Sequence, residues 1–161
     1  LEFRRVLFRS TTLIIQFGEL HMKTRTLAII KPDAVASGNT GKIIDRITNE
    51  GFTILSSKQM DMSLAQAEGF YEIHRGKPFY EELTHFMSSG PCVVLALEKD
   101  DAVNEWRCVI GATNPEEADE GTIRKLYAKN VGQNAVHGSD SDENGKKEVS
   151  FFFAECELIR N

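Results

Sequence analysis

The sequence has few of the features that mark secreted, membrane-spanning or nucleic-acid-binding proteins. It contains three cysteines, an odd number without CxxC spacing, which excludes a disulfide framework and a CxxC-type zinc site. It has no Asn-x-Ser/Thr acceptor and no run long and apolar enough to cross a bilayer. The net charge of −5 argues against a primary role in binding nucleic acid. We therefore expect a cytoplasmic protein with reduced thiols and no membrane association.

The usual phosphate-binding motifs are also missing. Neither GxxxxGK[ST] nor GxGxxG occurs in the sequence. The segment Gly38-Asn39-Thr40-Gly41-Lys42 resembles a phosphate loop, but its spacing is short and Ile43 stands where Ser or Thr is needed. We interpret this segment as the start of an ordinary helix.

Residues 1–21 have no helical or strand periodicity and are basic at the start. A targeting peptide would match that composition, but the stretch from Thr11 to Leu20 is too short to span a membrane and lacks a small-residue cleavage site. We expect Met22 to be the native start and residues 1–21 to be a non-native or disordered leader. Residues 22–161 are then expected to form one domain, because that length can bury a core of its own.

Hydrophobic periodicity predicts strands at residues 25–31, 52–62, 92–98 and 149–154. Helices are predicted at residues 40–50, 64–73, 79–87, 100–110 and 122–128, with a helical turn at 141–147. Ser63 and Gln66 form a capping-box pattern, and Pro78 suits the first position of a helix. The order favours two split β-α-β units on one antiparallel sheet, with a doubly wound parallel sheet as the main alternative.

The segment Asn134-Ala135-Val136-His137-Gly138-Ser139-Asp140-Ser141 is the most informative for chemistry. A neutral imidazole is a competent nucleophile near neutral pH. Gly138 is expected to leave room for a bulky group, and Glu148 can orient one ring nitrogen of His137 so that the other attacks. By itself, a lone histidine in a turn is more often a solvated or capping residue.

Basic and aromatic residues elsewhere suit a nucleotide. Lys31, Arg107 and Arg124 each close or follow an apolar segment, so their cations can meet in one cleft and bind phosphate oxygens. Thr113 can add a hydroxyl donor. Phe79, at the start of a predicted helix, can stack on a nucleobase, although a core position is equally compatible with the sequence.

Taken together, four segments resemble the nucleoside diphosphate kinase family, mainly its bacterial members. They are TLAIIKPDAV (26–35), KPFYEELTHFMSSGP (77–91), IGATNPEEADEGTIR (110–124) and NAVHGSDS (134–141). The last is the family's active-site signature, and the resemblance runs from about Lys23 to Phe153. It implies a ferredoxin-like sandwich, an α+β fold in which helices cover a four-stranded antiparallel sheet.

The resemblance also implies a role for each matching residue. His137 is expected to carry the phosphate, with Glu148, Ser139, Lys31 and Tyr71 as its catalytic neighbours. The nucleotide-binding set is expected to be Lys31, Phe79, Arg107, Thr113, Arg124 and Asn134. The cofactor is expected to be Mg2+ held by the nucleotide phosphates, without a direct protein ligand, and Asp140 would reach it through water.

The implied reaction is a ping-pong transfer of the γ-phosphate from a nucleoside triphosphate to a nucleoside diphosphate. Stacking on Phe79 without hydrogen bonds to the base edge would let one site accept ATP, GTP and other nucleotides. The resemblance further implies a homo-oligomer, a tetramer or hexamer built from dimers. The alternatives are a non-catalytic nucleotide-binding module, a phosphohistidine mutase or phosphatase, and a structural or nucleic-acid-binding protein.

Overall fold

The computed structural model describes residues 22–158, so the expected leader at 1–21 lies outside the described residues. The strands are β1 (Lys23–Ile30), β2 (Thr53–Asp61), β3 (Pro91–Asp100) and β4 (Val136–Gly138). The α-helices are α1 (Pro32–Ala36), α2 (Thr40–Asn49), α3 (Leu64–Phe70), α4 (Tyr80–Met87), α5 (Ala102–Ile110), α6 (Ile123–Tyr127) and α7 (Asp142–Phe152). Short 3-10 turns follow at η1 (Glu72–His74) and η2 (Glu155–Glu157).

The four strands form one sheet in the order β2-β3-β1-β4, and every neighbouring pair is antiparallel. β3 lies between β1 and β2, and β1 lies between β3 and β4, which is the pairing of two split β-α-β units. The expected ferredoxin-like fold is therefore confirmed, and the doubly wound parallel sheet is excluded.

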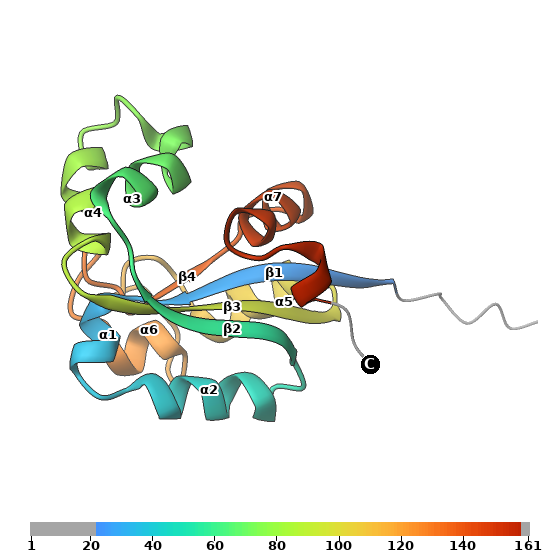
Figure 1. The fold of residues 1–161 in the computed structure, drawn as a ribbon. Helices are drawn as coiled ribbons and strands as arrows, with labels where there is room; N and C mark the ends of the chain where they lie inside the picture. The colour runs from blue at the N-terminus through green and yellow to red at the C-terminus, as the bar shows by residue number, and fades with distance from the viewer. Residues whose placement is uncertain (1–21, 159–161) are drawn as a thin grey trace, which may run out of the picture.

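Helices cover both faces of the sheet (Figure 1). Because successive side chains of a strand point to opposite faces, β1 and β3 divide their apolar residues between two cores. Ala28 and Ile30 pack with Ile43 of α2 and Trp106 of α5. The alternate positions of β1, such as Leu27, pack in the other core, against α3, α4 and α7. Both central strands are buried on both sides, which explains their near-continuous apolar runs.

The predicted last strand at residues 149–154 is wrong. This segment lies in α7 up to Phe152, and Ser141 caps the helix by accepting a hydrogen bond from the backbone N–H of Asn144. Val149 and Phe152 are buried three residues apart on one helix face, which a short apolar run does not distinguish from a strand. The fourth strand is instead β4, within residues 130–141, where no strand was predicted.

Smaller differences concern helix ends. Pro32 opens the short helix α1, which was not predicted and has the proline in its first turn. The capping box of Ser63 and Gln66 is confirmed in both directions, but α3 ends at Phe70 and the chain continues into η1. Phe79 is the N-cap residue of α4, so this helix begins at Tyr80, one residue later than predicted.

Candidate active site

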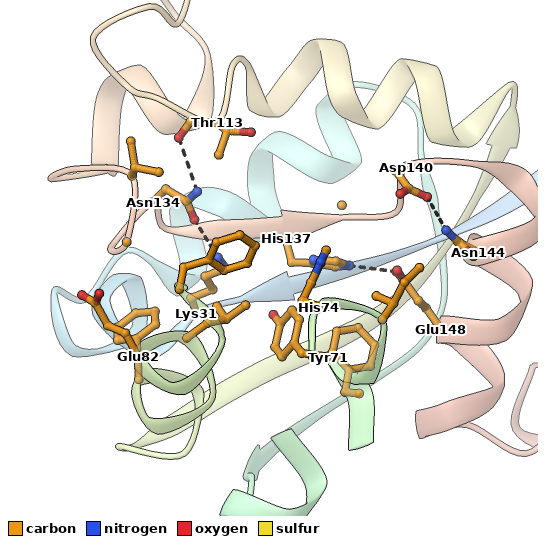
Figure 2. Close-up of a pocket in the computed structure, with 18 of the residues that line it drawn as sticks. Lys31, Tyr71, His74, Glu82, Thr113, Asn134, His137, Asp140, Asn144 and Glu148 are labelled. Atoms are coloured by element: carbon orange, nitrogen blue, oxygen red, sulfur yellow. Dashed lines mark hydrogen bonds and ion pairs between the residues drawn. The ribbon is translucent and has the colours of Figure 1, made fainter. Parts of the chain in front are cut away.

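A cavity of about 1130 Å³ is lined by residues of α3, α4, α5, α6, β4 and α7 and of the segments between them, with Lys31 directly after β1. It brings together predicted site residues that are far apart in the sequence (Figure 2). Those that line it are Lys31, Tyr71, Phe79, Arg107, Thr113, Arg124, Asn134, His137, Asp140 and Glu148. Ser139 is fully buried behind this lining.

His137 lies on β4, where it pairs with Ile29 of β1. Its Nε2 atom is 2.8 Å from Oε2 of Glu148, which reaches across from α7. No described residue forms a hydrogen bond with the other ring nitrogen, Nδ1. An imidazole held at Nε2 by a carboxylate carries its proton there, which leaves the Nδ1 lone pair available for attack.

Ser139 acts on Glu148 and not on the histidine ring. Its hydroxyl donates to Oε2 of Glu148 over 2.7 Å and accepts a hydrogen bond from the backbone N–H of Leu27 over 3.1 Å. Ser139 therefore ties the carboxylate to β1, and one oxygen of Glu148 receives hydrogen bonds from both the serine and the histidine. Glu148 thereby fixes the orientation of the imidazole, and Ser139 is a positioning residue that holds Glu148.

Lys31 directly follows β1 and is buried, with an exposed fraction of 6%. Its Nζ donates to Oδ1 of Asn134 over 2.7 Å. Burial and the neighbouring Arg124 guanidinium lower the pKa of Lys31 to about 8, against an opposing influence from Asp33. The positive charge of this buried lysine is only partly balanced by Asp33, so an anionic ligand beside it is favoured.

Arg124 is held by backbone oxygens and not by a carboxylate. Its two terminal nitrogens donate to the carbonyls of Gly111 (2.9 Å) and Val136 (3.1 Å). Burial and the nearby Arg107 lower the pKa of Arg124 to about 10. The Asn134 side chain also donates to the Thr113 carbonyl at 3.4 Å. Lys31, Arg107 and Arg124 together form a cationic cluster that suits a polyphosphate.

Comparisons with known proteins agree with this geometry. The family model described as nucleoside diphosphate kinase matches residues 24–158. The chain belongs to the nucleoside diphosphate kinase family. Nucleoside diphosphate kinases from Syntrophotalea carbinolica and Flavobacterium psychrophilum are 53% and 55% identical to it, over 84% and 81% of this chain and 98% and 94% of their own lengths.

Solved structures of this kinase family have the same fold. The Aquifex aeolicus nucleoside diphosphate kinase aligns with a TM-score of 0.84 and 42% identity, covering 86% of this chain and all of the other. The halophilic enzyme from Halobacterium salinarum, solved in complex with CDP, aligns with a TM-score of 0.82 and 34% identity, over 86% and 93% of the two chains. The predicted family is therefore confirmed.

Aromatic residues surround the histidine of this kinase-family site. Tyr71 is 4% exposed, and no described residue forms a hydrogen bond with its hydroxyl. Burial, followed by the Glu148 charge, raises the pKa of Tyr71, so its hydroxyl stays protonated. The Phe70 ring meets the His137 ring edge-on, with centroids 5.3 Å apart. Phe79 is half exposed, and the centroid of its ring lies 5.5 Å from that of the His74 ring.

Sequence reasoning missed Phe70 and His74. Neither belongs to a segment that we singled out for chemistry. The available signal was their position relative to Tyr71. Phe70 directly precedes this tyrosine and His74 follows it by three residues, so both lie near it once the chain turns at η1. Both rings line the cavity, Phe70 from the end of α3 and His74 from η1.

Gly138 has a structural role beside the one expected for it. A Cβ atom there would lie 2.6 Å from Cδ1 and 2.9 Å from Nε1 of Trp106. The indole N–H in turn donates to the carbonyl of His137 over 3.0 Å. The missing side chain therefore makes room for Trp106, which holds the backbone of the histidine, while Gly138 also lines the cavity.

Asp140 lies on the wall of the cavity near α7. Its Oδ1 accepts a hydrogen bond from Asn144 over 2.6 Å (Figure 2), and this bond holds the pKa of Asp140 below its usual range. Within residues 22–158, no group of three or more His, Cys, Asp or Glu side chains could hold a metal ion. A single ionised carboxylate fits a metal that brings its own oxygen ligands, as a nucleotide-bound ion does.

Proposed function

We propose that His137 carries the phosphate in the reaction of this nucleoside diphosphate kinase. As a member of that family, the protein is a phosphotransferase that moves the γ-phosphate of a nucleoside triphosphate to a nucleoside diphosphate. The observation that carries the proposal is the bond from Nε2 of His137 to Glu148, which leaves Nδ1 as the nucleophile in a cavity that also contains Lys31, Arg107 and Arg124.

In the first half of the cycle, the Nδ1 lone pair attacks the γ-phosphorus of the donor. The N–P bond forms as the bond from phosphorus to the β,γ-bridging oxygen breaks, and the nucleoside diphosphate leaves with that electron pair. Glu148 stabilises the positive charge that the ring gains. In the second half, a terminal phosphate oxygen of the acceptor attacks the same phosphorus, and the N–P electron pair returns to His137.

The remaining site residues bind and orient the nucleotide. Arg107, Arg124 and Lys31 offset the charge on the phosphoryl oxygens, which is the main contribution a protein makes to this transfer. Lys31 and Asn134 are joined at 2.7 Å and would hold the ribose hydroxyls as a pair. Thr113 donates to the phosphates, Phe79 stacks on the base, and Tyr71 offers its protonated hydroxyl beside His137.

Mg2+ is the proposed cofactor, held by the nucleotide phosphates, with Asp140 reaching it through water. The ion would supply charge neutralisation on the phosphate oxygens. What supports this assignment is the ionised Asp140 carboxylate on the cavity wall, together with the cations that share the cavity with it.

We also propose that the enzyme is a cytoplasmic homo-oligomer, a tetramer or hexamer built from dimers. Cys92, Cys108 and Cys156 are free thiols, which fits a reducing compartment. No helix of residues 22–158 is long and apolar enough to cross a membrane. β2 forms one edge of the sheet, where a second copy can pair. Light scattering on the purified protein would give the number of subunits.

The test is to incubate the protein with magnesium and γ-labelled ATP, to chase with unlabelled GDP, and to map the label. We expect acid-labile phosphate on His137 that moves to GDP. The His137→Ala variant should lose labelling while its affinity for ADP remains largely intact. Binding of ATP without any labelling of the wild-type protein would favour a non-catalytic nucleotide-binding module.

A further inference from the structure

A strained turn lies directly before the strand that carries His137. Ala135 has a φ of 68°, in the left-handed region that an L-residue with a Cβ atom seldom adopts. Across this residue, the backbone N–H of Val136 donates to the carbonyl of Asn134 over 2.8 Å, so Ala135 is the central residue of a γ-turn. A residue in such a conformation persists only when the surrounding structure holds it there.

The segment that follows β1 holds both backbone groups of Ala135. Its N–H donates to Oδ2 of Asp33 over 3.1 Å, and its carbonyl accepts the backbone N–H of Lys31 over 2.9 Å. Ala135 is fully buried, so water cannot replace either partner. The bond to Asp33 is the one made by a side chain, and a substitution can therefore remove it.

Asp33 does not touch the space where a nucleotide would bind. It is absent from the lining of the cavity that contains His137 and lines a second hollow of about 480 Å³. Its Oδ1 atom is buried, and no described residue forms a hydrogen bond with that oxygen. Because a buried carboxylate oxygen without a partner is unfavourable for folding, fold stability alone does not account for an aspartate at this position.

The turn sets the spacing between two parts of the active site. On one side of Ala135, the Asn134 side chain accepts a hydrogen bond from Nζ of Lys31 over 2.7 Å. On the other side, His137 follows by two residues and pairs with β1. In the proposed function the Lys31–Asn134 pair orients the nucleotide and His137 attacks it. Relaxation of the turn would shift the pair relative to the ring, and a misplacement of about 1 Å can slow such a reaction about 100-fold.

We propose that Asp33 is a positioning residue for the phosphate transfer. Its carboxylate holds Ala135 in the strained conformation, and the turn in that conformation aligns the nucleotide with His137. This inference rests on the proposed function and adds to it a residue that touches neither the nucleotide nor the histidine.

The simpler explanation is that Asp33 only stabilises the start of α1, since it lies in the first turn of that helix. The two explanations differ in what they change. A loss of stability would reduce the fraction of molecules that become phosphorylated, but not the rate constant of those that are folded. A loss of positioning would reduce the rate constant and leave that fraction unchanged.

The test is rapid-mixing phosphorylation of the full-length protein by γ-labelled ATP and magnesium, with amplitude and rate constant measured separately. Asp33→Ala should be phosphorylated about 10–100-fold more slowly, with full amplitude and with ADP affinity within about threefold of the wild-type value. Glu81→Ala is the matched control, because it removes a carboxylate from the first turn of α4 that does not line the cavity. It should leave the rate constant unchanged.

Two conservative variants separate the geometry of Asp33 from its charge. Asp33→Asn keeps an oxygen at the distance of Oδ2 and loses the charge, so its rate constant should stay within about threefold of the wild-type value. Asp33→Glu keeps the charge and the acidic first turn but displaces the acceptor by one methylene. It should slow phosphorylation by about tenfold or more. This pair decides the question even if Asp33→Ala does not fold.

Glycine at position 135 tests the strain directly. Glycine adopts a positive φ without the penalty that a Cβ atom imposes. Adding Ala135→Gly to Asp33→Ala should therefore restore the rate constant by roughly 5–30-fold, which is the population lost to a left-handed alanine. A merely structural role for Asp33 predicts no such recovery.

An Asp33→Glu protein that reacts as fast as the wild-type protein would overturn the inference, as would the absence of recovery in the double variant. Both results leave the proposed function standing, because wild-type His137 is still labelled. If the wild-type protein is not labelled, the proposed function fails first.

Discussion

The substitution Gly138→Ala tests how the histidine backbone is held. Its Cβ would lie 2.6 Å from Cδ1 of Trp106 and 3.1 Å from Cδ1 of Ile110, both closer than normal contact. Trp106 is fully buried, so the indole has little room to move. Any shift also stretches its 3.0 Å hydrogen bond to the carbonyl of His137.

The expected cost follows from these two effects. Overpacking a well-filled site costs about 1–3 kcal/mol, and leaving a buried N–H without its acceptor costs about 1–3 kcal/mol more. The free energy of unfolding should therefore fall by about 2–6 kcal/mol, which lowers the melting temperature by roughly 4–24 °C in a chain of this size. Phosphorylation of His137 should slow as well, because the ring is displaced relative to Glu148.

Urea and thermal unfolding measure the first effect, and labelling with γ-labelled ATP measures the second. Gly41→Ala is the matched control, since a Cβ atom there meets nothing within 4 Å inside the helix α2. It should leave stability unchanged or raise it by about 0.5–1 kcal/mol. A Gly138→Ala protein as stable and as readily phosphorylated as Gly41→Ala would refute the proposed contact with Trp106.

Three further predictions concern the site. Glu148→Gln should slow phosphate transfer about 10–100-fold with little change in ADP affinity, because it removes the charge that orients His137; an unchanged rate in stopped-flow measurements would contradict this. ADP affinity should fall as the pH rises through about 8, where Lys31 loses its proton and its positive charge; titrations of Lys31→Met, which has no charge to lose, should show a flatter profile. Phe79→Ala should weaken ADP, CDP and UDP by similar factors of about 5–100, and a loss confined to one of these bases would exclude simple stacking.

The central strands were predictable because their chemistry is local. The apolar runs of β1 and β3 reflect burial on both faces of the sheet, and Ser63 with Gln66 specifies a helix start within four residues. β4 was not predictable, because Val136–Gly138 is only three residues long and its strand conformation depends on pairing with β1. The spacing of Val149 and Phe152 suited either a strand or a helix until packing against β1 decided it.

Some features of the candidate site were also predictable from the sequence, and others depended on tertiary packing. The residue types of the site were readable from the sequence, since His137, Lys31 and Arg124 stand in segments that resemble the kinase family. The tertiary structure decided that Glu148 meets Nε2, that Ser139 acts through Glu148, and that Gly138 accommodates Trp106. Such contacts join residues that are 9 to 32 positions apart in the chain, and only the packing of helices on both faces of the sheet brings them together.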